Sequence, residues 1–331
     1  MARLSAARFQ RGAIMWDFSV AKTLSIVGRT MPFVLLRMAV YFGITFAYVI
    51  AAGTGAGIGY GVGQIGQDPT SFAIWGAVAG FGIVSAIVYW IREYILYMVK
   101  AGHIAVMVEL IDGEPVPQGQ ITHAQETVRA RFGEANVLFA LDQLIKGVIR
   151  AITGLLGGVA AFLPIPGLSG IVGFVNGIIR MSLTYVDEII LGYNIRIASD
   201  NPWATSRHAL VLYAQNGTHM IKNAVWLSVI MWVFSCIVFL IALAPASLFV
   251  YLMPGSVSGY GFVLAFMLAW SFKAAVMEPF AIAALMQVFF ARIEGQVPDP
   301  EWDRKLAGAS DKFRDLAEKA GSALGGRPAT H

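Results

Sequence analysis

The sequence predicts an all-α polytopic membrane protein: a helix bundle of about four spans plus a proline-broken re-entrant hairpin, with cytoplasmic amphipathic helices. Windows without Asp, Glu, Lys or Arg cover residues 38–67, 69–91, 151–179 and 223–272 of the 331-residue chain. The chain is 57% hydrophobic and 13% charged, whereas a soluble domain carries roughly 25% charged residues. A surface in water needs such charges, so we expect these windows to lie in lipid.

Residues 1–30 are expected to form a basic cytoplasmic arm and not a cleaved signal peptide. The basic residues before the first window are spread over a length far greater than the charged start of a secretory signal: Arg3, Arg8, Arg11, Lys22 and Arg29. Apolar residues of the arm, among them Phe18, Leu24, Ile26 and Val27, form an amphipathic stretch. We expect this stretch to lie on the anionic inner leaflet of the bilayer.

The membrane domain is predicted over residues 31–295, with spans at about 32–61, 72–98, 218–244 and 259–292. Of the connections, 64–71 holds only Asp68 and 246–258 holds no charge, whereas the others are rich in Lys and Arg. The positive-inside rule makes these two connections external and both termini cytoplasmic. The expected location is therefore the inner (plasma) membrane of the cell, with the lipid bilayer as the first partner.

The window 151–179 is interrupted by Pro164, Pro166 and Gly167. Each apolar arm holds about 13 residues and reaches only ~20 Å of a hydrocarbon core that is ~30 Å thick. Two alternatives follow: a re-entrant hairpin, which we favour, or two spans that are lengthened by the helices on either side. Both alternatives keep the two termini on the same side.

Cytoplasmic helices are predicted at 122–150 and 202–215. Thr122 begins a capping-box pattern for the first, and Asn201 and Asn216 bracket the second. The tail, 296–331, starts a helix at Asp299 and then places apolar residues at heptad spacing: Trp302, Leu306, Ala309, Phe313, Leu316, Ala320 and Ala323. We expect this seam to dock on the cytoplasmic helices or on the same tail of neighbouring subunits, and a cytoplasmic protein partner to bind through it.

Glycine occupies every second position of one run: Gly53, Gly55, Gly57, Gly59, Gly61 and Gly63. Small residues let another helix approach closely. The run resembles the glycine repeat in the first helix of ATP synthase rotor-ring subunits, and Gly59-Tyr60-Gly61 resembles the core of a potassium-channel selectivity filter, but no other feature follows either family. Packing within one subunit, a homo-oligomeric seam and a permeation path lined by backbone remain open as alternatives.

Three ionisable residues fall at membrane depth: Arg37, Lys273 and Glu278. A charge in hydrocarbon costs several kcal/mol unless it is paired or hydrated, so these residues are candidates for function. Lys273 and Glu278 lie about 140° apart on a straight helix and are poor partners. Arg37 and Glu278 lie at a similar depth, so we expect them to pair, as a structural ion pair, as a gate or ion-coupling site, or with snorkelling side chains.

Asp187 and Glu188 are adjacent carboxylates on a segment that is otherwise uncharged from 181 to 195. They are candidates for a ring of acidic groups at the cytoplasmic mouth of an oligomer. The alternative is that they cap a helix or pair with Arg180, Arg196 or Lys146 on neighbouring helices.

Several functions lack support in the sequence. The histidines show no metal-binding spacing, and neither a phosphate-binding Gly-x-x-x-x-Gly-Lys-Ser/Thr loop nor a Gly-x-Ser-x-Gly elbow is present. The net charge of only +4 gives no footprint for nucleic acid. We therefore expect no metal, no cofactor, no enzymatic activity and no nucleic-acid partner.

The function predicted from these features is that of an oligomeric channel or transporter for an ion or small solute. Proline-broken short helices and buried ionisable residues are the features that build sites at membrane depth. The competing hypothesis is a membrane scaffold that recruits partners or lipids through its cytoplasmic helices and tail.

Overall fold

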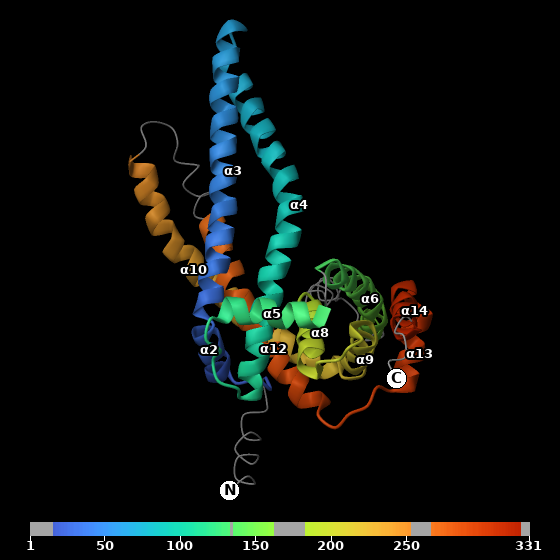
Figure 1. Ribbon diagram of the computed structural model, residues 1–331. Coiled ribbons are helices and arrows are strands. Elements are labelled where there is room, and N and C mark those ends of the chain that lie inside the picture. Colours follow the sequence, from blue (N-terminus) through green and yellow to red (C-terminus); the bar gives the residue numbers. More distant parts are fainter. Residues whose placement is uncertain (1–15, 133–134, 162–182, 253–265, 326–331) are drawn as a thin grey trace. The chain divides into compact units, whose positions relative to one another are not determined.

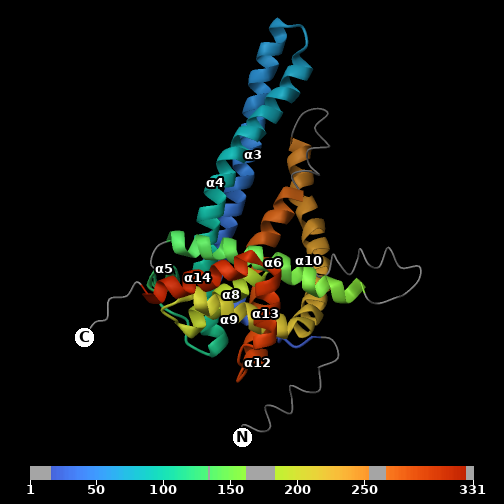
Figure 2. The same ribbon diagram turned by 90° about the vertical axis from the view of Figure 1, so that its right-hand side faces the viewer.

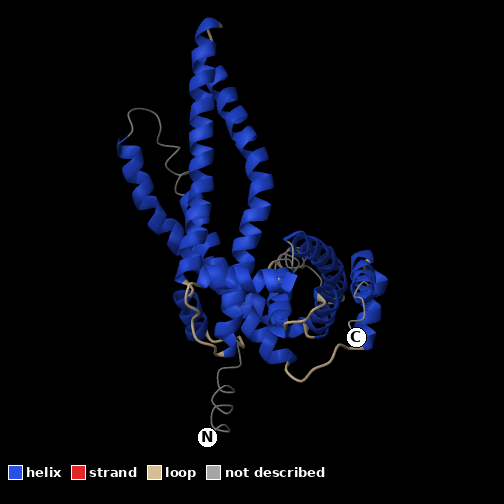
Figure 3. Cartoon of the chain, in the orientation of Figure 1, coloured by secondary structure: helices blue, strands red, loops and turns tan. Residues whose placement is uncertain are grey.

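The computed structural model describes residues 16–132, 135–161, 183–252 and 266–325, and all regular structure in these ranges is helical (Figure 3). The helices, labelled in Figure 1, are α2 (Val20–Arg29), α3 (Met31–Ile65), α4 (Pro69–Asp112), α5 (Gln120–Phe132), α6 (Ala135–Ala161), α8 (Val186–Ile197), α9 (Pro202–Gln215), α10 (Gly217–Leu252), the π-helix η1 (Lys273–Met277), α12 (Glu278–Ile293), α13 (Pro300–Ala309) and α14 (Asp311–Gly325).

Four helices of the described chain are long and apolar enough to cross a membrane: Met31–Ile65, Pro69–Val88, Gly217–Ala244 and Phe266–Ile293. They fall on the predicted spans 32–61, 72–98, 218–244 and 259–292. The hairpin turn expected at Pro164, Pro166 and Gly167 lies outside the described residues. Helix α6 continues without a break from the predicted amphipathic helix to Ala161, an arrangement that both alternatives for 151–179 allow.

Backbone chemistry explains where the long helices end. Gln67, with φ of 60°, separates α3 from α4, and the Asp68 carboxylate accepts a hydrogen bond from the Ser71 amide at 3.2 Å, which caps α4. Helix α4 then extends to Asp112 and stops at Gly113, whose φ is +96°. The helix therefore extends beyond the predicted span 72–98 and ends where a glycine adopts a positive φ.

The chain divides into two compact units, which are described separately. Unit 2 comprises Met31–Lys100 and Phe234–Glu278. In this unit α3 and the first part of α4 run side by side from the turn at 66–68 (Figures 1 and 2). Tyr48 and Phe81 stack across them with ring centroids 4.7 Å apart, and η1 packs on α3 through a core of Tyr41, Ala274 and Ala275.

Unit 1 comprises Met1–Thr30, Ala101–Val233 and Pro279–His331. Its core is built around α12, whose residues Ala281–Ala284, Met286 and Phe289 are fully buried. Helix α2 packs into this unit through Ile26 and Val27, and Phe18, which precedes the helix, is buried as well. The Gln287 side chain donates to the Thr23 hydroxyl at 2.8 Å. The face of the amino-terminal arm that was expected on lipid therefore lies partly inside the protein, although Leu24 stays exposed.

The tail docks on unit 1 through the seam that the heptad spacing predicted. Helix α14 packs against α6 and α9, and Leu306, Phe313 and Leu316 are fully buried. The Asn201 side chain donates to the Ala320 carbonyl at 2.9 Å. Asn201 also caps α9 by accepting from the Ala204 amide, and Asp299 caps α13 by accepting from the Glu301 amide.

The structure differs from the prediction at the start of helix 122–150 and within the tail helix. The expected helix 122–150 is α5 followed by α6, and α5 begins at Gln120, so Thr122 lies inside it and does not cap it. The expected tail helix breaks at Ser310, an extended residue between α13 and α14 whose hydroxyl accepts from the Phe313 amide. Serine competes for backbone donors in this way and starts a new helix.

Candidate functional site

Arg37 of α3 is the centre of a polar site inside unit 2. Its side chain is only 1% exposed, and Nη2 lies 2.8 Å from Oε2 of Glu278, which is 24% exposed. The two residues meet as their common depth in the sequence suggested. Nη2 also donates to the carbonyl oxygen of Ala274 at 2.9 Å, so one guanidinium nitrogen contacts both a carboxylate and the backbone of the last span.

The backbone contact compensates for a proline. In η1 the Glu278 amide donates to the Lys273 carbonyl, five residues back, as in a π-helix. The next residue, Pro279, has no N–H to continue the pattern. Its partner would have been the carbonyl of Ala274, and this is the carbonyl that Arg37 reaches. Arg37 thus supplies the donor that proline cannot provide.

Lys100 of α4 is a member of the site that the sequence did not reveal. Its Nζ lies 3.6 Å from the same Glu278 oxygen that Arg37 contacts. The signal available in the sequence was its position two residues after the predicted span. Lys273, by contrast, is exposed and forms no ion pair with any described residue, so the structure separates it from the other two predicted members.

A polar face continues along α3 from Arg37 through Tyr41 to Thr45, residues four apart that are all buried. Thr45 Oγ1 and Ser271 Oγ are 2.9 Å apart, and Ser271 donates to the Met267 carbonyl. Ser271 has one hydroxyl hydrogen, so Thr45 is the donor between them. Between these two contacts, Tyr41 meets Trp270 edge to face at 5.8 Å.

The glycine run has two faces with different surroundings. A Cβ atom on Gly55 or Gly59 would lie 2.1 Å and 2.0 Å from the carbonyl oxygens of Gly76 and Phe72, and one on Gly63 would lie 2.7 Å from Pro69 Cα. These three glycines therefore let α3 and α4 approach to backbone contact. A Cβ on Gly53, Gly57 or Gly61 meets nothing within 4 Å in the described structure, because their face points roughly 160° away.

Asp187 and Glu188 begin α8 in unit 1 and lie beside an acidic residue of α6, Asp142. Lys146 Nζ is 2.7 Å from Asp142 and 3.9 Å from Asp187, so the lysine pairing named in the sequence analysis is present, whereas Arg196 pairs with Asp112. Burial, followed by repulsion and hydrogen bonding from Glu188 and repulsion from Asp142, raises the pKa of Asp187 well above its usual range. The group therefore binds a proton more tightly than a carboxylate in water does.

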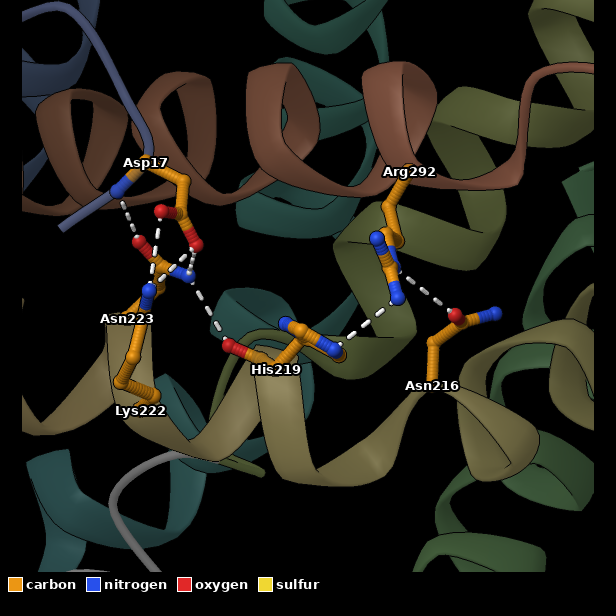
Figure 4. A network of polar contacts seen from close by, with 6 residues as sticks. All are labelled: Asp17, Asn216, His219, Lys222, Asn223 and Arg292. Atoms are coloured by element: carbon orange, nitrogen blue, oxygen red, sulfur yellow. Dashed lines mark hydrogen bonds and ion pairs between the residues drawn. The ribbon is translucent and has the colours of Figure 1, made fainter. Parts of the chain in front are cut away.

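A polar network missed in the sequence fixes the amino-terminal arm to the start of α10 (Figure 4). The Asp17 carboxylate accepts from Lys222 at 2.9 Å and from the Asn223 amide group at 2.8 Å. Farther along, Arg292 lies 2.9 Å from His219 Nε2 and donates to Asn216 at 3.3 Å. Burial raises the pKa of Asp17, but hydrogen bonds from Lys222 and Asn223 lower it more, so the carboxylate is held ionised.

In the part of the chain that the structure describes, no group of three His, Cys, Asp or Glu side chains is arranged to hold a metal ion. Comparisons with protein-family models, with curated proteins and with solved structures found no match to this chain.

Proposed function

We propose that this protein is a membrane channel or transporter for an ion or small solute, and that Arg37 and Glu278 form its gate or coupling pair. The observation that carries the proposal is the Arg37–Glu278 ion pair at a π-helix inside an apolar span. An ion pair inside a membrane protein is costly, because the loss of hydration can exceed the attraction between the charges. A packed hydrophobic pair would stabilise the same helices at lower cost.

The surroundings of the pair also support a moving part and not only a structural one. π-Helical turns inside α-helices occur frequently at functional sites. Lys100 offers Glu278 a second cation at 3.6 Å, so the carboxylate can exchange partners without becoming an isolated charge. The hydroxyls of Thr45 and Ser271 continue the polar side chains along the same helix pair.

Other predicted features take their place in this proposal. Asp187 and Glu188 line the cytoplasmic mouth, and the hairpin around Pro164 and Pro166 lines the path. The open glycine face of Gly53, Gly57 and Gly61 is the seam at which copies of the chain assemble into a homo-oligomer. Both termini lie in the cytoplasm.

The test is flux through liposomes that contain the purified protein. Dyes enclosed in the liposomes report whether wild-type protein passes ions or small solutes. Arg37→Met is expected to change that flux by about tenfold or more, which corresponds to a change of roughly 1.4 kcal/mol in the gating equilibrium. Lys273→Met is the matched control, because it removes an exposed cation at the first residue of the π-helix that makes no ion pair with any described residue. Wild-type protein that passes neither ions nor small solutes contradicts the proposal.

A membrane scaffold is the second candidate, and one observation favours it. The tail is a folded element whose outer face carries exposed charges, including Arg314, Glu318 and Lys319, while its apolar seam is already used within the chain. A scaffold would bind partners through that charged face. Absence of flux, together with tail-dependent capture of a cytoplasmic protein, would establish this function in place of the first.

A further inference from the structure

We propose that the contact of Arg37 with Ala274 holds the last span in its π-helical register, and that loss of this contact lets the span change to an α-helical register. The role of this register change in gating rests on the permeation function proposed above. It adds the regulation of that site: which segment moves, in which direction, and what the movement does to the polar face of α3.

The position of the proline distinguishes the two registers. In the π-helical register each N–H donates to the carbonyl five residues back, so the missing N–H of Pro279 leaves the Ala274 carbonyl without its helical donor. In the α-helical register each N–H donates to the carbonyl four residues back, so the Ala275 carbonyl is the one left without a donor. Arg37 Nη2 donates to Ala274 at 2.9 Å. The arginine therefore satisfies the carbonyl that only the π-helical register leaves open, and so it stabilises that register.

The described residues enclose the segment before η1 less completely than they enclose α12, so we assign the movement to this segment. From Phe280 to Phe290, α12 is almost entirely buried. Before η1, Phe266 is 61% and Trp270 40% exposed. A π-helical turn holds one more residue than an α-helical turn, so its conversion rotates the preceding segment by about 100° and shifts it by about 1.5 Å. Each residue is replaced in space by the next one, and Phe272 takes the place of Ser271.

This exchange changes the chemistry beside Thr45. In the π-helical register Thr45 donates to Ser271; in the α-helical register the same hydroxyl faces a phenyl ring. A polar contact becomes an apolar one, and apolar constrictions can close a path by excluding water. Lys100, 3.6 Å from Glu278, provides the carboxylate with a cation after Arg37 has released it.

Disulfide cross-linking reads the register directly. In a Cys236→Ser background, Thr45→Cys is combined with either Ser271→Cys or Phe272→Cys, the protein is reconstituted in lipid and oxidised, and free thiols are counted by gel shift with a maleimide polymer. A disulfide requires Cβ atoms about 3.8 Å apart, so the 45/271 pair is expected to form about tenfold faster than the 45/272 pair. Adding Arg37→Met is expected to reverse this preference, and adding Lys273→Met to leave it unchanged.

The inference is overturned if folded Arg37→Met protein, with wild-type helical content and elution volume, keeps the 45/271 preference. Should the single variant fail to fold, the double variant Arg37→Met/Glu278→Leu is read in the same way, because removing both charges avoids an unpaired buried carboxylate. Absence of flux from the wild-type protein contradicts the proposed function, whereas the cross-linking ratio alone decides the register.

Discussion

The ionisable residues show how far single positions can be interpreted from sequence. The pairing of Arg37 with Glu278 follows from their similar depth in two apolar spans, and the structure brings them to 2.8 Å. Lys100 was missed because it follows the predicted span, whereas α4 continues past that point and holds Lys100 Nζ 3.6 Å from Glu278. The π-helix was missed as well, since the spacing of apolar residues does not reveal that one turn of a helix contains an extra residue.

Asp187 allows a prediction at the residue scale, because its pKa is raised by burial and by the carboxylates of Glu188 and Asp142. A raised pKa means that the folded state binds the proton more tightly than the unfolded chain, so stability falls as pH rises and Asp187 ionises. Asp187→Asn keeps a neutral side chain at every pH. We expect the variant to have a higher Tm than wild type at pH 8, measured by thermal unfolding in detergent.

The gain in Tm of Asp187→Asn over wild type should decrease as the pH is lowered. It is expected to shrink as pH falls and to vanish below about 4, the ordinary pKa of aspartate, because wild-type Asp187 is then protonated in both the folded and the unfolded state. Asp315→Asn is the control, since this carboxylate is only partly buried on α14 and pairs with Lys312, and its replacement should show no such gain. If Asp187→Asn is no more stable than wild type at pH 8, the raised pKa of Asp187 is contradicted.

At the scale of elements, the glycine run separates into a packed face and an open one. Gly59→Leu and Gly57→Leu change helix propensity equally, but only the first places side-chain atoms against backbone, since a Cβ on Gly59 would lie 2.0 Å from the Phe72 carbonyl oxygen. We expect Gly59→Leu to destabilise the α3–α4 pair by about 1–3 kcal/mol or more. Gly57→Leu should leave thermal stability unchanged and, if copies assemble at that face, reduce the oligomer mass measured by light scattering.

Equal loss of stability in the two variants would show that the faces are not different, and an unchanged oligomer mass in Gly57→Leu would remove that face as the seam. The sequence alone left packing within one subunit, a homo-oligomeric seam and a backbone-lined permeation path as alternatives, because alternation by two places glycine on opposite sides of a helix. The neighbouring helix determines which side is used. Gly76 and Gly80 of α4 provide the matching small surface, and a Cβ on Gly80 would lie 2.1 Å from the Ala51 carbonyl oxygen.

Element boundaries follow from local chemistry more closely than from charge. Asn201 and Asp299 were predicted as caps and act as caps, because a short polar side chain before a helix has few other roles. Helix α4 extends beyond the predicted span 72–98 to Asp112, where Gly113 with its positive φ ends it. The break at Ser310 was missed because the heptad spacing continues across it.

At the scale of the whole molecule, the membrane class was the most secure prediction, because it depends on long charge-free windows and not on any single contact. The four helices of the described chain that are long and apolar enough to cross a membrane fall on those windows or overlap them. The division into two units was not predictable, since α4, α10 and the last span each contribute residues to both. A continuous helix gives no sign in its sequence of where one packed unit ends.

Topology gives the last prediction. The segment 64–71 is expected outside the membrane and the tail inside, because Lys and Arg are concentrated in the other connections. In a Cys236→Ser background, Gln64→Cys should react with a membrane-impermeant maleimide on sealed spheroplasts, whereas Ser322→Cys should react only after the membrane is opened. Both positions are exposed in the structure, so a difference in labelling reports the side of the membrane. Labelling of Ser322→Cys on sealed spheroplasts would reverse the orientation and place the Asp187 and Glu188 end of any path outside the cell.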